Sequence, residues 1–407
     1  MDPATGDPAL DVRDAGTGVS GAESETLPND ALRVGFGMTA LAHGLAGTGV
    51  DGIGAYTREL GARLAGMPGV DLRSYVYGPP IGLPDGFIAQ DVGSFRRQAL
   101  AALLTGASFP GLRAMAGNSV DVVHATDHLV PRLRGTPVVA TIMDAIPLAH
   151  PEWVSYPLKR INNALWKRSV QWADRIVTIS EFSRTEIERW FGVPGERIHV
   201  VPLGVHRRWF ESPAPAETER VRARYRLPDA YFLSIGTLQP RKNVLRLIAA
   251  HRRLPETLRR EVPLVVVGKA GWSCDEEVAQ MQDRDDACLH WLGYVPDVDL
   301  PGVVAGAAAL VFVSLHEGFG LPVLEAFAAG VPVVASGTTA LPEVASGAAL
   351  VVDPTNVGEI ADAMQQILQA PGLAAGLRES GLSRAREFTW ERTAERTLAV
   401  YRNLADI

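Results

Sequence analysis

The chain of 407 residues is 47% hydrophobic and 21% charged, carries a formal net charge of −7 and contains two isolated cysteines. Its length predicts two domains, because one hydrophobic core rarely serves so many residues. We find no apolar run of the roughly 18 residues that span a membrane, no secretory signal pattern, and no cysteine spacing typical of a metal site or a disulfide framework. We therefore expect a cytoplasmic protein.

Charge is unevenly distributed along the chain. Residues 1–30 hold seven acidic residues, one arginine and no aromatic residue, which predicts a disordered acidic tail. Residues 31–210 hold 19 Lys and Arg against 14 Asp and Glu, whereas residues 211–407 hold 19 against 25. The basic first half favours an anionic partner there, unless the solvated faces of the two halves simply differ.

Short apolar runs alternate with longer amphipathic segments, which is typical of parallel sheets covered by helices. We expect strands at Leu32–Met38, Asp121–Ala125, Pro137–Ile142, Arg175–Ile179, Ile198–Pro202, Tyr231–Ile235, Pro263–Val267, Leu289–Leu292, Leu310–Val313, Val331–Ala335 and Ala349–Val351. The charged, proline-bearing stretch His206–Leu227 predicts a linker. The expected α/β fold is two doubly wound, Rossmann-like domains, 31–206 and 207–389, facing each other across a ligand-binding cleft.

Glycine-rich sequences follow the first expected strand. The pattern G-x-G-x-x-G occurs at Gly47–Gly52 but also at Gly16–Gly21, inside the expected tail, so the pattern alone indicates little. "GFGMTA" would be a dinucleotide fingerprint if a helix followed at once, whereas we expect a long loop there. Gly52 and Gly54 precede an expected helix from about Ala55 to Ala65, where backbone N–H groups could approach an anion, or form a plain turn.

Two later loops carry charge at the ends of expected strands. In "GTLQPRKN", Arg241 and Lys242 precede a helix that Asn243 is placed to cap; two cations there would suit a diphosphate, or merely face solvent.

In "HEGFGLPVLEAF", Gly318 and Gly320 keep the loop free of side chains, and Pro322 predicts the first turn of a helix. N–H groups of that turn could reach a phosphate. We expect Glu325 in the same turn, holding ribose hydroxyls, with Glu317 on the other side of the phosphate site. The pair suits a sugar nucleotide; the alternative is a capping acid and a surface acid.

These segments resemble the retaining glycosyltransferases of family 4, which have the two-domain GT-B fold. The resemblance is carried by "HEGFGLPVLEAFAAGVPVVAS", "GTLQPRKN", "GVDGIGAYTREL" and "ADRIVTISEFSRTEIERWFGVPGERIHVVPLGV", and it extends over about residues 32–404. It implies that the C-terminal helix, within 390–407, returns to the first domain. The loops are most similar to those of bacterial mannosyltransferases of surface-polysaccharide synthesis.

The resemblance implies a role for each matching position. Catalysis would depend on Glu317, Arg241 and Lys242, the two cations neutralising the diphosphate while Gly52 and Gly54 line its other side. The donor sugar and distal phosphate would contact Glu317, Gly318, Phe319, Gly320 and Leu321, and Glu325 would hold the ribose.

The acceptor side departs from the family. Relatives commonly have histidine where this chain has Met143, before Asp144, so the role of that histidine cannot be transferred. Thr126, Asp127 and His128, which follow another expected strand, are alternative polar groups on the acceptor side.

The resemblance implies transfer of a hexose, with mannose favoured, from a nucleotide diphosphate sugar such as GDP-mannose to a hydroxyl of a glycan or lipid-linked acceptor, with retained anomeric configuration. Neither a cofactor nor a metal ion is expected, because fixed cations would stabilise the leaving diphosphate. "DVD" at Asp297–Asp299 is expected to cap a helix rather than bind metal. Nor do we expect a nucleic-acid partner.

Two alternatives stay open. A catalytically silent sugar-nucleotide-binding protein is favoured by Met143 alone. A nicotinamide-dependent dehydrogenase would use "GFGMTA" but leaves Arg241, Lys242 and the two glutamates unexplained.

The segment "YPLKRINNALWKRSVQWADR" predicts a helix that contacts the inner face of the cell membrane weakly, because it combines aromatic and basic residues: Trp166 and Trp172 with Lys159, Arg160, Lys167 and Arg168. The alternative is that Ile161, Leu165 and Trp172 face the core and the cations form an ordinary solvated face.

Overall fold

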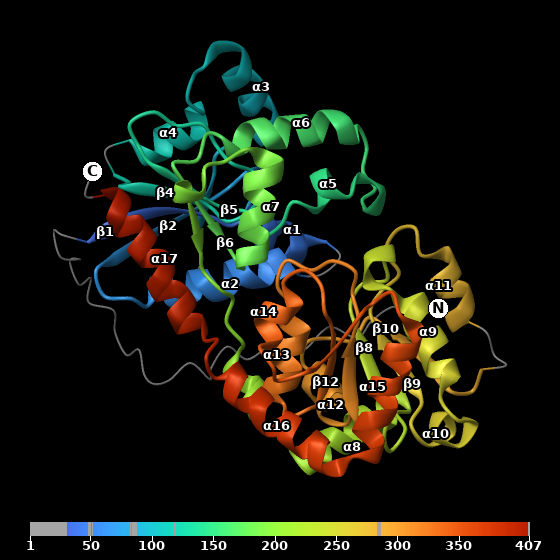
Figure 1. Cartoon of the computed structure of the whole chain (residues 1–407). Coiled ribbons are helices and arrows are strands. Elements are labelled where there is room, and N and C mark those ends of the chain that lie inside the picture. Colours follow the sequence, from blue (N-terminus) through green and yellow to red (C-terminus); the bar gives the residue numbers. More distant parts are fainter. Residues whose placement is uncertain are drawn as a thin grey trace, which may run out of the picture.

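The computed structural model describes residues 31–47, 50, 52–81, 83, 88–117, 119–282 and 286–405. The expected acidic tail, residues 1–30, lies outside the described residues, as does part of the Gly47–Gly52 pattern. The described chain forms two α/β domains, each built on its own parallel sheet (Figure 1).

The first domain has a seven-stranded sheet in the order β3-β2-β1-β4-β5-β6-β7, in which every neighbouring pair is parallel. The strands are β1 (Leu32–Gly37), β2 (Val70–Val76), β3 (Ala89–Asp91), β4 (Val122–Ala125), β5 (Val138–Thr141), β6 (Arg175–Thr178) and β7 (Ile198–Val200). Its helices are α1 (Thr39–Ala46), α2 (Gly52–Ala65), α3 (Phe95–Thr105), α4 (Pro110–Ala116), α5 (Ile146–Ala149), α6 (Lys159–Val170) and α7 (Glu181–Phe191).

The second domain has a six-stranded parallel sheet in the order β10-β9-β8-β11-β12-β13. The strands are β8 (Phe232–Ile235), β9 (Leu264–Val267), β10 (Leu289–Gly293), β11 (Ala309–Phe312), β12 (Val333–Ser336) and β13 (Leu350–Val352). The helices are α8 (Pro215–Tyr225), α9 (Val244–Arg253), α10 (Glu256–Glu261), α11 (Asp275–Met281), α12 (Leu300–Ala305), α13 (Leu321–Ala328), α14 (Leu341–Ala345), α15 (Val357–Gln369) and α16 (Pro371–Ala385).

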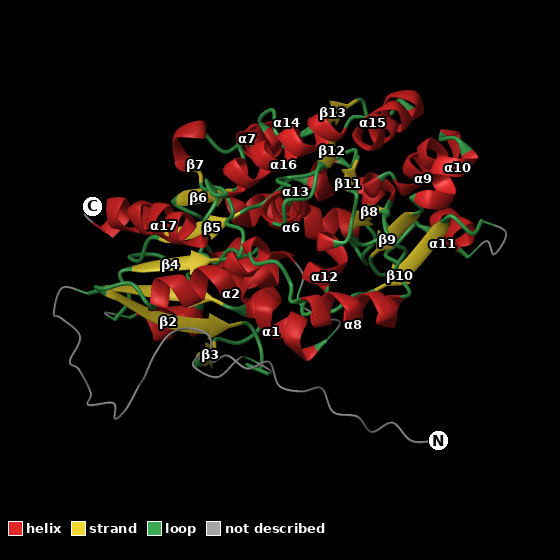
Figure 2. Cartoon of the chain, turned by 90° about the horizontal axis from the view of Figure 1, so that it is seen from below, coloured by secondary structure: helices red, strands yellow, loops and turns green. Residues whose placement is uncertain are grey.

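Central strands of both sheets are buried along their whole length, as "VVAT" of β5 and "LVVV" of β9 illustrate. Helices cover both faces of such a sheet, so its strands are continuously apolar rather than alternating; Figure 2 shows the strands lying between helices. This is why each strand expected from the sequence is present close to its expected place.

Two strands and one helix differ from the expectation. β2 was missed because Asp71, Arg73 and Ser74 interrupt its apolar pattern, and its pairing with β1 holds it in the sheet. β3 is short and polar. The long loop expected after β1 is wrong: α1 begins at Thr39, because Leu41 and Ala42 bury an apolar stripe in the core.

The strand order of each sheet reverses beside the first strand of its domain, between β1 and β4 and between β8 and β11. Loops that leave the carboxyl ends of strands at such a point form a crevice. The loops after β4 and β5 carry Thr126–His128 and Met143–Asp144, and those after β8 and β11 carry Arg241–Lys242 and His316–Gly320. Nearly all candidate site residues therefore lie at the carboxyl ends of the strands, in one sheet or the other.

The expected linker contains the short 3₁₀ helix η4 (Arg207–Phe210) and α8, which packs against α12. Fully buried Asp299 holds this pair together: it accepts a hydrogen bond from Tyr225 Oη at 2.7 Å and forms ion pairs with Arg224, at 3.0 Å, and Arg220. Asp299 precedes α12 but makes no side-chain cap, so the capping role expected for it is wrong.

The chain passes between the domains twice, and the two passages run side by side. Val205 N donates to Phe388 O at 3.0 Å, and Thr393 Oγ1 donates to Pro202 O at 2.8 Å. Helix α17 (Trp390–Ala405) then packs against α2 and β4, and is the red helix beside the first sheet in Figure 1. The C-terminal helix thus returns to the first domain, as the resemblance implied.

Within the described residues, no single helix is both long and apolar enough to cross a bilayer; α3 and α4 meet both criteria only as a pair, bent by 98°.

We predict that Gly204→Ala destabilises the protein, because a Cβ at Gly204 would lie 2.2 Å from the backbone nitrogen of Trp390. The expected loss is about 1–3 kcal/mol, seen as a lower melting temperature in circular dichroism. Gly376→Ala is the control, since a Cβ there, inside α16, meets open space; we expect it to be neutral or to stabilise by about 0.5–1 kcal/mol. Equal melting temperatures would contradict the close packing at Gly204.

Candidate active site

The loop between β11 and α13 follows a tight path that glycine permits. Gly320 has φ = +112°, and a Cβ there would lie 2.5 Å from Leu341 Cδ2. A Cβ on Gly318 would lie 2.9 Å from the carbonyl oxygen of Met143, in the first domain. Pro322 is in the first turn of α13, as predicted. The loop backbone can therefore come close to the opposite domain.

Glu317, in this loop, lies between the two candidate cations. Its Oε1 accepts a hydrogen bond from Lys242 Nζ at 2.5 Å, and its Oε2 is 2.9 Å from Arg241 Nη1. All three side chains are at least four-fifths buried. The structure thus brings together the three residues expected in catalysis, and the two cations exceed the one carboxylate by one positive charge.

The pKa values of this cluster follow from burial and from the pairing. Burial raises the pKa of Glu317, but Lys242 and Arg241 lower it by more, to about 2. Burial lowers the pKa of Lys242 to about 8, and Glu317 offsets only part of that effect. At neutral pH Glu317 is therefore ionised and Lys242 is mostly protonated, so the positive excess of the cluster favours an anion.

The turn that carries the cations, η5 (Pro240–Lys242), is joined to the same loop by its backbone. Arg241 Nη1 donates to His316 O at 3.0 Å, and Leu315 N donates to Arg241 O at 2.7 Å. Asn243 precedes α9 but does not cap it: its Nδ2 donates to Val313 O at 2.9 Å and to Pro354 O at 2.6 Å. The predicted cap is therefore wrong, and Asn243 instead ties the turn to β11.

Two serines that the sequence analysis did not single out join this loop to the first domain. Ser180 Oγ donates to Gly318 O at 2.7 Å, and it also caps α7 by accepting from Ser183 N. Ser183 Oγ lies 2.7 Å from Met143 O and 3.1 Å from Gly318 O, so its one proton is shared. Both serines follow β6, at the same edge of the sheet as the other site loops, and this position could have identified them from the sequence.

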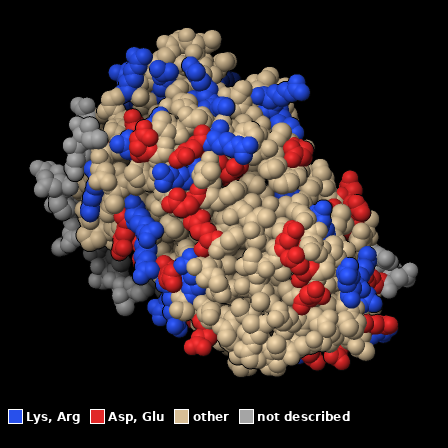
Figure 3. Space-filling model, viewed as in Figure 1, with Lys and Arg blue, Asp and Glu red and all other residues tan. Residues whose placement is uncertain are grey.

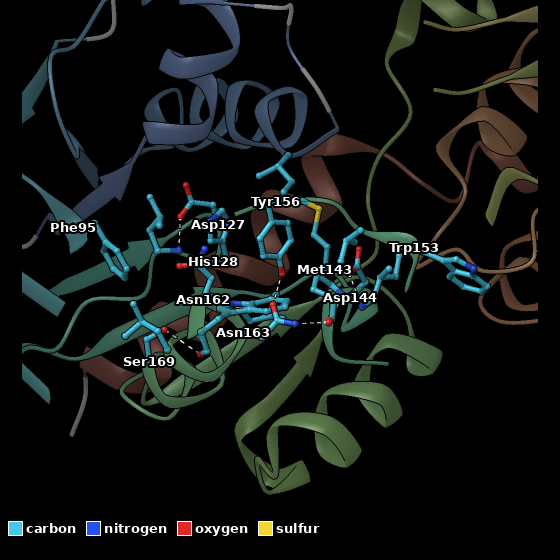
Figure 4. Close-up of a pocket in the computed structure, with 18 of the residues that line it drawn as sticks. Phe95, Asp127, His128, Met143, Asp144, Trp153, Tyr156, Asn162, Asn163 and Ser169 are labelled. Atoms are coloured by element: carbon cyan, nitrogen blue, oxygen red, sulfur yellow. Dashed lines mark hydrogen bonds between the residues drawn. The ribbon is translucent and has the colours of Figure 1, made fainter. Parts of the chain in front are cut away.

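A cavity of about 820 Å³ opens beside this cluster (Figure 4) and is lined by both domains. It brings together all four residues expected on the acceptor side, Thr126, Asp127, His128 and Asp144, with Gln239 and Arg241 across from them. In Figure 4, Met143, Asp144 and Trp153 lie toward one end, Phe95 and Ser169 lie at the other, and Asp127 and His128 lie between.

The four acceptor-side residues differ in their surroundings. Thr126 is buried and donates to Gly37 O at 2.7 Å, so its hydroxyl already serves the fold. Asp127 accepts from Leu129 N at 2.8 Å, whereas His128 is exposed beside the edge of Trp166. Burial raises the pKa of Asp144; the Ile146 N–H and Arg241 oppose this, and Glu317 adds to it. Asp144, expected on the acceptor side, thus interacts electrostatically with Arg241 and Glu317.

Gly52 and Gly54 lie in the first turn of α2, with Gly52 exposed and Gly54 buried. A Cβ on Gly52 would meet open space. Ile53, between them, lines the cavity. The start of α2 therefore borders the site, although the cavity lining does not include the glycines.

Glu325 is not in the first turn of α13, as expected, but in the second, because the helix begins at Leu321. It is half-buried against η4, where Trp209 donates a hydrogen bond to it. Burial raises the pKa of Glu325 to about 7, while Arg208 and Trp209 oppose the shift.

An aromatic cluster that the sequence analysis missed closes one end of the cavity. Trp272 of the second domain donates its indole N–H to Trp153 O of the first. His150 stacks on Trp153 with ring centroids 3.9 Å apart, and buried His316 meets both rings edge-on. Within the described chain, neither ring nitrogen of His316 has a hydrogen-bond partner.

Two family models match the chain in succession: Glycosyltransferase Family 4 over residues 50–209 and Glycosyl transferases group 1 over residues 216–384. The chain is 34% identical over 286 residues to O-antigen chain mannosyltransferase B of Escherichia coli, covering 70% of this chain and 74% of that protein. It is 32% identical over 315 residues to the MMP alpha-(1->4)-mannosyltransferase of Mycolicibacterium hassiacum, covering 72% and 74% respectively.

Solved structures resemble the whole fold. Sucrose-phosphate synthase from Thermosynechococcus elongatus has a TM-score of 0.69 at 19% identity, covering 92% of this chain and 99% of that one. Anabaena HepE, solved with UDP and glucose, has a TM-score of 0.67 at 16% identity, covering 91% and 100%. At these identities the likeness concerns the fold alone, which is two Rossmann-like domains in the GT-B arrangement.

We predict that Glu325 makes stability depend on pH. Its pKa is about 7 when folded, against 4.5 for an ordinary glutamate, so between these values the folded state keeps a proton that the unfolded state has lost. Stability must then fall as pH rises through this window, by up to about 3 kcal/mol. Glu325→Gln should therefore raise the melting temperature relative to the unsubstituted protein at pH 8 but not at pH 4.

Glu379→Gln, at an exposed position of α16, is the matched control and should leave the pH profile unchanged. If Glu325→Gln behaves like this control at both pH values, the burial of Glu325 against η4 is not what the structure indicates.

Proposed function

Because the chain belongs to the family 4 glycosyltransferases, we propose that it is a retaining mannosyltransferase that uses a nucleotide diphosphate sugar, with GDP-mannose favoured, and a hydroxyl of a glycan or lipid-linked acceptor. The observation that carries the proposal is the buried cluster of Arg241, Lys242 and Glu317, in which Arg241 lines the interdomain cavity. The mannosyltransferases that it resembles support the choice of sugar. Family membership argues against the dehydrogenase alternative.

The cluster would act on the leaving group. Negative charge develops on the diphosphate as the bond to the anomeric carbon breaks, and preorganised cations stabilise that charge more strongly than water does. Arg241 and Lys242 supply the cations, and the N–H groups at the start of α13 add the positive end of a helix dipole. We propose that the leaving phosphate accepts the proton of the acceptor hydroxyl, so that no separate base is needed.

We propose that the remaining donor contacts lie around the Arg241–Lys242–Glu317 cluster. Glu317, Gly318, Phe319, Gly320 and Leu321 would contact the transferred sugar and the distal phosphate, Gly52 and Gly54 would line the other side, and Glu325 would hold the ribose. Glu325 is half-buried beside the linker. It lies four residues after Leu321, the first residue of α13, and this helix follows the proposed phosphate site. Asp144, Asp127 and His128 would face the acceptor.

We further propose that this cytoplasmic enzyme meets the inner face of the cell membrane through α3 and α6. Figure 3 shows Lys and Arg gathered at the end of the molecule where α3, α4 and α6 lie. Three side chains that were predicted to contact the membrane have partners within the protein instead. Trp166 and Trp172 pack inward, against Phe191 and Phe109, and Lys159 is occupied by Pro151 O and Val154 O.

The outward face of α6 is therefore formed by its other cations, Arg160, Lys167 and Arg168, together with Ile161, which is 63% exposed. Leu165 and Trp172 do face the core, as the alternative held, but Ile161 does not. Exposed leucines and arginines of α3 lie at the same end.

We predict that Arg241→Ala or Lys242→Ala lowers kcat about 10²-fold or more, because each removes a preorganised charge from the leaving group. Turnover is measured with GDP-mannose and a mannoside acceptor, and donor affinity by thermal shift. Arg253→Ala, which removes an exposed cation from α9 in the same domain, is the control and should keep full activity. An active Arg241→Ala/Lys242→Ala double variant would refute the proposal, and donor binding without hydrolysis or transfer in the unsubstituted protein would favour the silent binding protein.

We predict that the protein co-sediments with anionic liposomes at low ionic strength and is released by salt, since each cation contributes only about 1 kcal/mol. Reversing Arg160, Lys167 and Arg168 to Glu should abolish sedimentation. The matched control reverses three exposed arginines of the second domain, Arg253, Arg378 and Arg386. Equal losses in the two variants would mean that net charge, and not the α6 surface, is responsible.

A further inference from the structure

The cavity beside the catalytic cluster is longer than an acceptor hydroxyl requires. Beyond Asp127 and His128 it continues between α3 and α6 into a part that we call the inner chamber, lined by Phe95, Leu129, Leu158, Leu165, Trp166 and Ser169. Figure 4 shows Phe95 and Ser169 at this end, far from Trp153. Aliphatic and aromatic side chains make up most of this lining.

Two asparagines and a serine around the inner chamber already have partners within the protein. Asn163 donates to Pro147 O at 2.6 Å and accepts from the hydroxyl of Tyr156. Asn162 donates to Pro157 O at 2.8 Å and accepts from Arg96 at 3.2 Å. Ser169 donates to Trp166 O at 3.1 Å.

The Trp166 indole nitrogen has no partner among the described residues, but it is itself buried and out of a ligand's reach. A second sugar ring in this chamber would meet mostly apolar walls and few free polar groups, and burying hydroxyls without hydrogen bonds is costly. A hydrocarbon carries no such cost and gains from the apolar walls.

The inner chamber also continues to an apolar surface. Leu158, which lines it, is 65% exposed, and close by in sequence Ile161 is 63% exposed. On α3, Leu100 and Leu104 are 59% and 79% exposed. The hydrogen bond from Arg96 to Asn162 holds α3 and α6 together, so these side chains and the arginines beside them belong to one end of the domain.

We infer that the acceptor is a glycolipid, whose terminal sugar presents its hydroxyl beside Asp144 while the hydrocarbon next to its reducing end occupies the inner chamber. This inference rests on the proposed function, and it assigns the α3–α6 part of the cavity to an apolar aglycone rather than to further sugars. Leu158 stands at the point where the chain would pass from the surface into the protein.

The test compares soluble acceptors, so that membrane docking plays no part. Methyl α-mannoside, octyl α-mannoside below its micelle concentration, and an α-linked mannobiose are each assayed with GDP-mannose. We expect KM for octyl α-mannoside to be at least tenfold below that for methyl α-mannoside, with little gain for mannobiose. Leu158→Asn should remove most of the octyl preference and leave methyl α-mannoside turnover unchanged.

Asparagine is chosen because Leu158 has φ = +54°, a conformation that asparagine tolerates, so the variant should fold. Ile161→Asn is the matched control: it removes a similarly exposed apolar side chain that does not line the cavity, and it should keep the octyl preference. Equal KM values for the methyl and octyl mannosides, or a gain for mannobiose as large as for the octyl compound, would overturn the inference. Transfer to methyl α-mannoside would still support the proposed function in either case.

A binding measurement covers the case in which turnover is too slow. A brominated octyl α-mannoside should quench tryptophan fluorescence, and Trp166→Phe should remove most of the quenching. The compound is added at concentrations that saturate the thermal shift seen with octyl α-mannoside. The inference would also be overturned if no quenching occurred there, or if quenching were unchanged in Trp166→Phe.

Discussion

A carboxylate buried between two cations is the interaction on which the site depends. Ionised groups cost several kcal/mol each to remove from water unless they are paired with good geometry. Glu317 satisfies Lys242 through one oxygen and Arg241 through the other. This pairing fixes the loops after β8 and β11 against each other, together with two further bonds: Leu315 N donates to Arg241 O, and the Arg241 guanidinium donates to His316 O. Within these three side chains one positive charge is left over, and Arg241 lines the cavity.

The first domain is joined to the loop that carries Glu317 by two serine hydroxyls and by a close approach of backbone atoms. The carbonyl oxygen of Gly318 receives the hydroxyls of Ser180 and Ser183, and Ser183 also reaches Met143 O. Asp144 follows Met143 directly, so the same contact sets the distance from Asp144 to the loop between β11 and α13. A side chain on Gly318 would push the walls apart. The histidine expected at position 143 is absent, but this contact uses the backbone carbonyl of residue 143 and does not depend on its side chain.

Much of this arrangement follows from local sequence, and the rest depends on which strands are neighbours. Buried parallel strands are continuous apolar runs, so they could be predicted, whereas β2 carries Asp71 and Arg73 and could not. Glycines and cations directly after strands indicated the donor loops. The pairing of Glu317 with Lys242 was not predicted, because it requires β8 and β11 to be adjacent. Asn243 and Asp299 were misplaced for the same reason: local position suggested helix caps, and distant partners determined their actual contacts. Glu325 was misplaced because α13 begins at Leu321.

The paired interdomain passages limit how the two domains can move. A single linker would let them twist as well as separate, but here residues 201–206 and 386–390 are hydrogen-bonded side by side, with Gly204 against the backbone of Trp390. Torsion about either segment would break contacts with the other, so these contacts favour rotation of the domains about a common axis over independent twisting. The two domains would then open and close by a hinge motion, and each closure would bring Gly318 back to the carbonyl oxygen of Met143.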